Sequence, residues 1–252
     1  MLSVDVLDEL ATAVQAAESD LLDLLADDEV RQEDDITSRL SQGIRLFATQ
    51  VDDVRITMNV IDGVGRGAAE STVGADIIGA VSIDVDGATV RKGFLAQAKM
   101  AGSDGLFFRP TGVNGTGGLD YSHAISRGPS AAPAPVAGIF SGTVEVTRPR
   151  GRLPKQCRKM LGITPDSFVF VYDSAQIAVC SATAVVAHSN ATQGTRHPLG
   201  TKTLSDFFIN LADCFIGDLD LGSASQAAVV DQARQLRART ALYMSISDAP
   251  TP

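Results

Sequence analysis

Two β-type runs joined by a two-residue turn constrain the fold of this chain most. Residues 75–85 are rich in isoleucine and valine, Asp86 and Gly87 follow, and residues 88–98 can form the return strand. Asp-Gly is a strong hairpin signal, because the central residues of such a turn need a positive φ that this pair tolerates. The sequence therefore predicts an antiparallel hairpin.

The turn also determines which residues lie opposite one another. Asp76 lies ten residues before the turn and Gln97 lies ten residues after it, so we expect them to face each other across the ladder. Gln97 and Lys99 are two residues apart and therefore project from the same face. The hairpin should bring Asp76, Gln97 and Lys99 together at one end, within reach of Glu70 in the preceding glycine-rich connection.

These four side chains suit the hydrolysis of a phosphodiester bond. Mg²⁺ prefers hard oxygen ligands, which the carboxylates of Glu70 and Asp76 and the amide of Gln97 offer. Lys99 can hold the attacking water and neutralise charge on the phosphate. A metal-bound water loses its proton near pH ~7, which supplies hydroxide. We therefore expect Mg²⁺ or Mn²⁺ as the cofactor.

The remaining pattern predicts an α/β protein with a mixed central sheet flanked by helices. Expected helices cover residues 4–25, 35–50, 153–161, 204–216 and 225–239, and further expected strands cover 54–61, 167–172 and 177–187. Residues 101–150 are rich in Gly, Pro, Ser and Ala, which predicts a mobile insert with one short strand at 138–147. We expect an acidic helix at 1–30, followed by one domain over 31–252 that ends in helices.

At the hairpin the chain resembles the PD-(D/E)xK, or restriction-endonuclease-like, nuclease superfamily. The resemblance is carried by Glu70, Gly74-Ala75-Asp76-Ile77 and Gln97-Ala98-Lys99. It implies an αβββαβ core over residues 35–173 and cleavage of DNA, or less readily of RNA. Gln97 stands where glutamate is commoner in that family, which removes one charge from the site.

The same resemblance implies two further features. A polar residue on the helix after the motif often joins the site, and here that residue is Gln156. Nucleases of this size and fold often act as effectors in bacterial anti-phage or restriction systems, so a cytoplasmic role of that kind is expected.

Charge is distributed unevenly along the chain. The net charge is −9, but residues 1–35 hold twelve acidic groups and one basic group, so the rest carries a net +2. A basic cluster that can contact DNA phosphates lies between residues 145 and 159. A solvated surface is the alternative reading of this cluster, whose members are Arg148, Arg150, Arg152, Lys155, Arg158 and Lys159.

The helix predicted at 4–25 has a continuous apolar stripe opposite its acidic face. Such a stripe is seldom left exposed. Three alternatives follow: a contact with a second copy or a regulatory partner, a cover for the basic cluster, or completion of the core of its own domain.

Two other functions stay open. A nuclease fold without catalysis would act as a binding or assembly subunit, which Gln97 and the acidic arm would suit. Gly63, Gly65 and Ala68 have the G-x-G-x-x-A spacing of a dinucleotide-binding oxidoreductase. The residues that follow this loop make a poor helix, which counts against that alternative.

Composition disfavours several classes of protein. The chain has no run of 18 apolar residues, so we expect no membrane span. Its first residues are acidic where a secretory signal would be basic. Cys157, Cys180 and Cys214 are widely spaced, which fits a reduced cytoplasm better than a disulfide framework or a zinc cluster.

Overall fold

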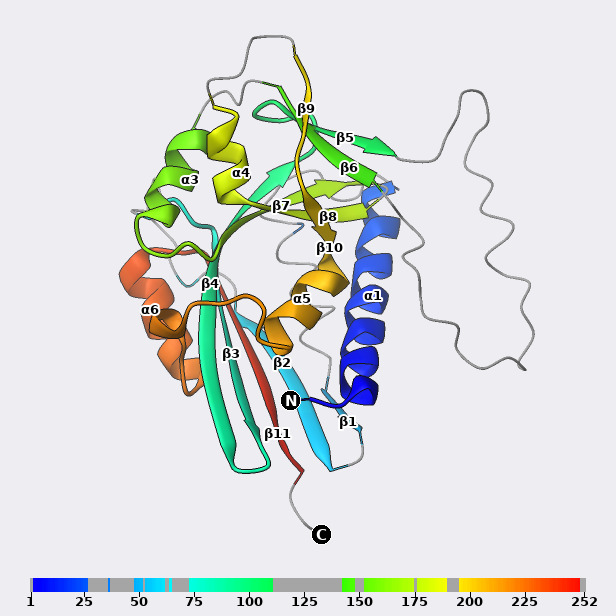
Figure 1. The fold of residues 1–252 in the computed structure, drawn as a ribbon, viewed down its shortest axis with the longest axis vertical. Coiled ribbons are helices and arrows are strands. Elements are labelled where there is room, and N and C mark those ends of the chain that lie inside the picture. Colours follow the sequence, from blue (N-terminus) through cyan, green and yellow to red (C-terminus); the bar gives the residue numbers. More distant parts are fainter. Residues whose placement is uncertain are drawn as a thin grey trace, which may run out of the picture.

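A computed structural model describes residues 2–26, 36, 48–51, 53–61, 64, 73–110, 142–147, 152–174, 176–189 and 195–249. Its centre is an eight-stranded mixed sheet in the order β1-β2-β11-β3-β4-β7-β8-β10 (Figure 1). A second sheet has the order β5-β6-β9. Helices pack on both faces of the main sheet. The predicted α/β class, with a mixed central sheet flanked by helices, is confirmed.

The elements have the following bounds. The helices are α1 (Val4–Ala26), α3 (Leu153–Leu161), α4 (Ala182–Ala187), α5 (Leu204–Ala212), the 3-10 helix η2 (Leu219–Leu221) and α6 (Gln226–Leu236). The main sheet contains β1 (Ala48–Val51), β2 (Val54–Ile61), β3 (Ile77–Val85), β4 (Ala88–Met100), β7 (Ser167–Asp173), β8 (Gln176–Ser181), β10 (Thr201–Thr203) and β11 (Thr240–Asp248). The small sheet contains β5 (Leu106–Pro110), β6 (Gly142–Val146) and β9 (His197–Pro198).

Strands β3 and β4 confirm the predicted hairpin. Asp86 and Gly87 turn the chain with φ angles of 53° and 72°, the left-handed region that Gly and Asp tolerate. Ile77 pairs with Ala96, which is the register expected from the turn. Beyond the hairpin, β4 runs parallel to β7, so α3 lies on the crossover between these two strands.

Strand β11 was not predicted, and it changes the order of the sheet. It lies between β2 and β3, antiparallel to the first and parallel to the second. Leu242, Met244 and Ile246 are buried and alternate with half-buried residues, so the two-residue period was present in the sequence. The predicted core over 35–173 is therefore interrupted by a strand from outside that range.

Two other predictions need correction. Residues 177–187 do not form one strand, because Ser181 ends β8 and caps α4 by accepting a hydrogen bond from the backbone N–H of Thr183. Residues 48–51 form strand β1 and pair with β2 instead of ending a helix. The one described residue within 35–47 of that predicted helix, Ile36, is helical.

The predicted insert at 101–150 is only partly described. Residues 106–110 and 142–146 pair as β5 and β6, and Leu106 is fully buried. Residues 101–110 thus form a turn and a paired strand, and the short strand expected within 138–147 is confirmed. The predicted mobility of the insert stays a prediction. Residues 111–141, with most of the predicted insert, lie outside the described residues.

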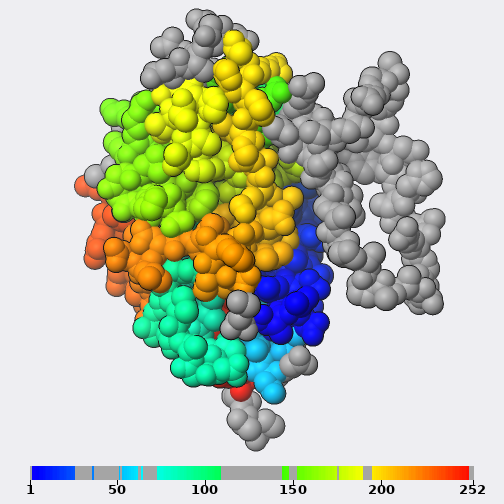
Figure 2. Space-filling view, viewed as in Figure 1, coloured from blue at the N-terminus to red at the C-terminus, as the bar shows by residue number. Residues whose placement is uncertain are grey.

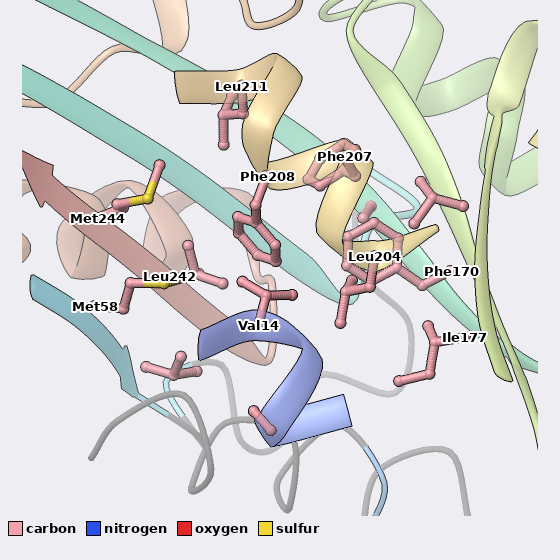
Figure 3. Packing of buried hydrophobic residues seen from close by; sticks show 14 of the residues in the cluster. Val14, Met58, Phe170, Ile177, Leu204, Phe207, Phe208, Leu211, Leu242 and Met244 are labelled. Atoms are coloured by element: carbon pink, nitrogen blue, oxygen red, sulfur yellow. The ribbon is translucent and has the colours of Figure 1, made fainter. Parts of the chain in front are cut away.

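Helix α1 confirms the predicted N-terminal helix and belongs to the core. Its apolar stripe is buried against α5 and one face of the main sheet. Figure 3 shows Val14 of α1 facing Phe208 of α5, beside Met58 and Leu242 of the sheet. Of the three alternatives for this stripe, the structure shows the third, completion of the core of its own chain. The stripe consists of Val6, Leu10, Val14, Ala17, Leu21 and Leu25.

A second apolar cluster lies on the other face of the sheet, under α3, α4 and α6. Cross-strand neighbours share a face, so Ile78 of β3 and Leu95 of β4 both belong to this cluster. Residues of β4 at even positions, such as Phe94 and Ala96, face α1 and α5 instead. None of the described helices is long and apolar enough to cross a membrane.

Glu18 joins α1 to the hairpin of β7 and β8. Its Oε1 accepts a hydrogen bond of 2.8 Å from the backbone N–H of Ile177. Burial raises the pKa of the Glu18 carboxyl from 4.5 to about 7, and the hydrogen bond from Ile177 lowers it by less. The folded chain thus keeps a proton that the unfolded chain releases. The free energy of unfolding therefore falls as pH rises through this interval.

We predict that Glu18→Gln raises the free energy of unfolding by roughly 1 to 3 kcal/mol above about pH 7. The amide keeps an oxygen for the Ile177 N–H but cannot ionise. Below about pH 4.5 the two proteins should be equally stable, because Glu18 is then protonated in both states. Urea titrations across this range measure the difference. Asp20→Asn, on an exposed position of the same helix, is the control, and an equal gain at every pH would contradict the prediction.

Candidate functional site

The structure brings Asp76, Gln97 and Lys99 to one face of the main sheet. Asp76 directly precedes β3, and its backbone N–H donates a 2.9 Å hydrogen bond to the carbonyl of Ala96, which sets it opposite Gln97. Gln97 and Lys99 occupy odd positions of β4, on the face covered by α3. Both are buried, with exposed fractions of 1% and 8%.

Two donors hold the Asp76 carboxylate at the end of the hairpin. Gln97 Nε2 donates a hydrogen bond to Asp76 Oδ2, and the backbone N–H of Ala98 donates to the same oxygen at 3.3 Å. The other end of the Gln97 amide has a different environment. Its Oε1 is buried and accepts no hydrogen bond from the described part of the chain.

Helix α3 places Gln156 beside this end of the sheet. Gly74, two residues before Asp76, packs directly on the backbone of Gln156, so a Cβ on Gly74 would stand 2.6 Å from the Gln156 carbonyl oxygen. Gln156 Oε1 is also buried, and no described residue donates a hydrogen bond to it. Each of the two glutamines therefore keeps a buried amide oxygen that could accept a donor or a cation.

Lys99 lies between α3 and the turn that follows β4. Its Nζ is 3.8 Å from Asp104 Oδ2, and its side chain is 10% exposed. Asp104 was not among the predicted site residues, although the Gly-Ser-Asp-Gly run at 102–105 marks a turn next to Lys99. This turn signal was the clue that the prediction missed.

Cys157 follows Gln156 on α3 and lies within electrostatic range of Lys99. Burial raises its pKa to about 12, and the nearby charge of Lys99 lowers it by less. The Cys157 thiol is therefore neutral at physiological pH and is not a nucleophile. Its place is structural, because it packs with Leu153 and Met160 on the buried side of α3.

The predicted basic cluster is described in part. Arg152, Lys155 and Arg158 are exposed at or near α3, and Arg158 Nη2 donates a 2.8 Å hydrogen bond to Ser189 Oγ. Figure 2 shows the green and yellow surface of α3 and α4 separated from the blue surface of α1 by gold and orange residues. The acidic helix therefore does not cover α3. Arg148, Arg150 and Glu70 lie outside the described residues.

The donors at this site fit a hard divalent cation in kind. The described residues contain no group of three His, Cys, Asp or Glu side chains that could hold a metal. They offer instead the Asp76 carboxylate and the buried amide oxygens of Gln97 and Gln156. Mg²⁺ takes one or two carboxylates and keeps several waters, so oxygen donors of this type suit it better than a softer metal.

The topology does not favour a dinucleotide site at residues 63–68. Apart from Val64, these residues lie outside the described ones. A dinucleotide-binding loop joins two parallel strands through a helix. Here β2 is antiparallel to β11, which is parallel to β3, so β2 and β3 run in opposite directions and are not neighbours.

Comparisons with protein families, with curated proteins and with solved structures found no match for this chain. The interpretation of the site therefore depends on its chemistry.

We predict that Gly74→Ala lowers the free energy of unfolding by about 2 to 4 kcal/mol, because the methyl group would strike the backbone of Gln156. Gly87→Ala is a matched control, since Gly87 also has a positive φ of 72° but has open space around it. Gly87→Ala should lower the free energy of unfolding by only about 1 to 2 kcal/mol, because it adds backbone strain but no steric clash. Denaturant titrations measure both values, and equal losses would contradict the close contact between Gly74 and α3.

Proposed function

We propose that this protein is a metal-dependent nuclease of the PD-(D/E)xK type, which hydrolyses phosphodiester bonds in DNA. One observation carries the proposal: Asp76, Gln97 and Lys99 lie on the same face at one end of β3 and β4. A carboxylate, a neutral oxygen donor and a cation are the side chains that such a reaction needs. The exposed cations of α3, beside this site, further support a polyanionic substrate.

Asp76 and Gln97, together with Glu70, would hold Mg²⁺ or Mn²⁺. The ion would supply charge neutralisation and a more acidic water. Gln97 now directs its Nε2 toward Asp76. Rotation of the terminal amide would direct Oε1 there instead, and two facing oxygens repel each other unless a cation or a proton lies between them. Gln97 would therefore exchange a hydrogen bond to Asp76 for a shared cation.

Lys99 would position the attacking water and offset the charge that develops on the phosphate. Its largely buried setting strengthens such an interaction, because little solvent screens the ammonium. Lys155 and Arg158 would bind phosphates on either side of the cleaved bond. These are backbone contacts, so they imply low sequence specificity or specificity supplied by a partner. A role in bacterial anti-phage or restriction defence would suit such a nuclease.

A catalytically inactive binding subunit is the second candidate. The hydrogen bond from Gln97 to Asp76 favours it, since a polar pair that satisfies itself can be purely structural. Because Gln97 is neutral, Asp76 is the one carboxylate among the proposed metal ligands that the structure describes. This candidate predicts DNA binding through α3 without any cleavage.

We predict that the protein nicks or linearises plasmid DNA in Mg²⁺ or Mn²⁺ and that EDTA stops the reaction. Asp76→Asn and Lys99→Ala should lower the rate by at least ~10²-fold without unfolding the chain. Gln97→Glu should retain activity and bind the metal more tightly, because it adds a ligand charge. Gel assays with circular dichroism measure these effects. Cleavage that persists in Asp76→Asn would sink the assignment of this site.

A second prediction concerns DNA binding by α3. Lys155→Ala and Arg158→Ala should each reduce the slope of log K against log[salt] by about 1, because each removes one phosphate contact. Lys202→Ala, an exposed cation on β10, should leave the slope unchanged. Fluorescence anisotropy with a labelled duplex at several salt concentrations measures the slopes. Equal slopes in all variants would show that the basic cluster is only a solvated surface.

A further inference from the structure

Asp104 lies in a short turn between the two sheets, and this turn has unusual backbone geometry. Three of its residues have positive φ: 85° at Gly102, 48° at Asp104 and 83° at Gly105. Two of them are glycines, which adopt this left-handed backbone conformation without steric strain. Asp104 has a side chain, so the same conformation is energetically unfavourable for it. Non-glycine residues held in the left-handed region cluster at functional sites, where the surrounding structure keeps them in place.

Hydrogen bonds fix the turn on both sides. Gly102 N–H donates to the carbonyl of Leu106 at 2.7 Å, and Leu106 N–H donates to the carbonyl of Ser103 at 2.8 Å. Ser103 Oγ donates to the carbonyl of Met100 at 2.6 Å. The N–H of Thr147, which directly follows β6 of the small sheet, donates to the Gly105 carbonyl at 3.0 Å. These hydrogen bonds hold the backbone that places the Asp104 carboxylate near the Lys99 ammonium.

We propose that Asp104 is a positioning residue that holds the ammonium of Lys99 toward the candidate site. The 3.8 Å between Asp104 Oδ2 and Lys99 Nζ is an ion-pair distance and too long for a hydrogen bond. Asp104 thus attracts the ammonium without taking one of its hydrogens. Through this contact the small sheet, which braces the turn at Thr147, supports Lys99. The catalytic part of the proposal rests on the proposed nuclease function.

Lys99 needs such a partner because of its length and its surroundings. A lysine side chain has a flexible four-carbon stem and a compact charge, so its ammonium takes many positions unless another group holds it in place. With 10% of the side chain exposed, solvent screens its charge weakly, and a carboxylate at this distance selects one orientation. A reacting group displaced by about 1 Å can lose ~10²-fold in rate.

The test is Asp104→Asn in the full chain. Asparagine tolerates a positive φ as well as aspartate does, so the variant removes the charge and keeps the turn. Asp86→Asn is the matched control, because Asp86 also has a left-handed φ of 53° but lies at the opposite end of β4. The first measurement is acylation of Lys99 by an amine-reactive ester, quantified by mass spectrometry relative to the exposed Lys202.

Asp104→Asn should acylate at Lys99 several-fold faster than the parent protein, with an unchanged melting temperature, and Asp86→Asn should not. In plasmid cleavage, Asp104→Asn should lower kcat by about 10- to 100-fold with KM unchanged. Unchanged acylation of Lys99 would overturn the proposal, and so would faster acylation with unchanged kcat. A lower melting temperature, together with a fall in kcat and a rise in KM by the same factor, would show that Asp104 has a structural role instead. If the parent protein cleaves no DNA, the nuclease proposal fails, but the acylation result still decides whether Asp104 holds Lys99.

Discussion

The antiparallel pairing of β3 with β4 holds both the core and the candidate site in register. A slip of one residue would turn every side chain of β4 to the other face, so Gln97 and Lys99 would point into the apolar layer under α1 and α5. The Asp86-Gly87 turn sets the register at one end. Gly79 sets it in the middle, because the ring of its cross-strand partner Phe94 occupies the place that a Cβ on residue 79 would take. Burial of hydrophobic side chains on both faces then makes any other register costly.

The two faces of the main sheet are packed by different kinds of side chain. Under α1 and α5 the packing is apolar and aromatic. The ring centroid of Phe207 lies 4.9 Å from that of Phe94 and 5.3 Å from that of Phe170. Under α3 the apolar cluster gives way, at the ends of β3 and β4, to the polar side chains of Asp76 and Gln97. A rigid apolar layer on one side lets the other side keep buried polar atoms, which cost stability unless something satisfies them.

The separation of charge follows from the same layers. The acidic helix α1 and the basic helix α3 pack on opposite faces of the sheet. Exposed charges separated by more than about 10 Å are largely screened at moderate ionic strength, so α1 does not cancel the cations of α3. A net charge of −9 is therefore compatible with a polyanionic substrate that approaches from the α3 side. Lys99 lies on the α3 face, with its Nζ 3.8 Å from Asp104 Oδ2.

Features that depend on local chemistry and on residue spacing could be predicted from the amino-acid sequence. The Asp86-Gly87 turn predicted the hairpin and its register, the 3.6-residue stripe predicted α1, and both are present. Features that depend on pairing between distant segments could be seen only in the folded chain. Strand β11 had a visible two-residue period, but nothing local says that it lies between β2 and β3, because strand order is chosen by packing of the whole sheet. Two contacts could likewise be found only in the folded chain: that of α3 with Gly74 and that of Asp104 with Lys99. Hydrogen bonds and close contacts between separate elements orient these groups. No residue spacing in the sequence encodes that orientation.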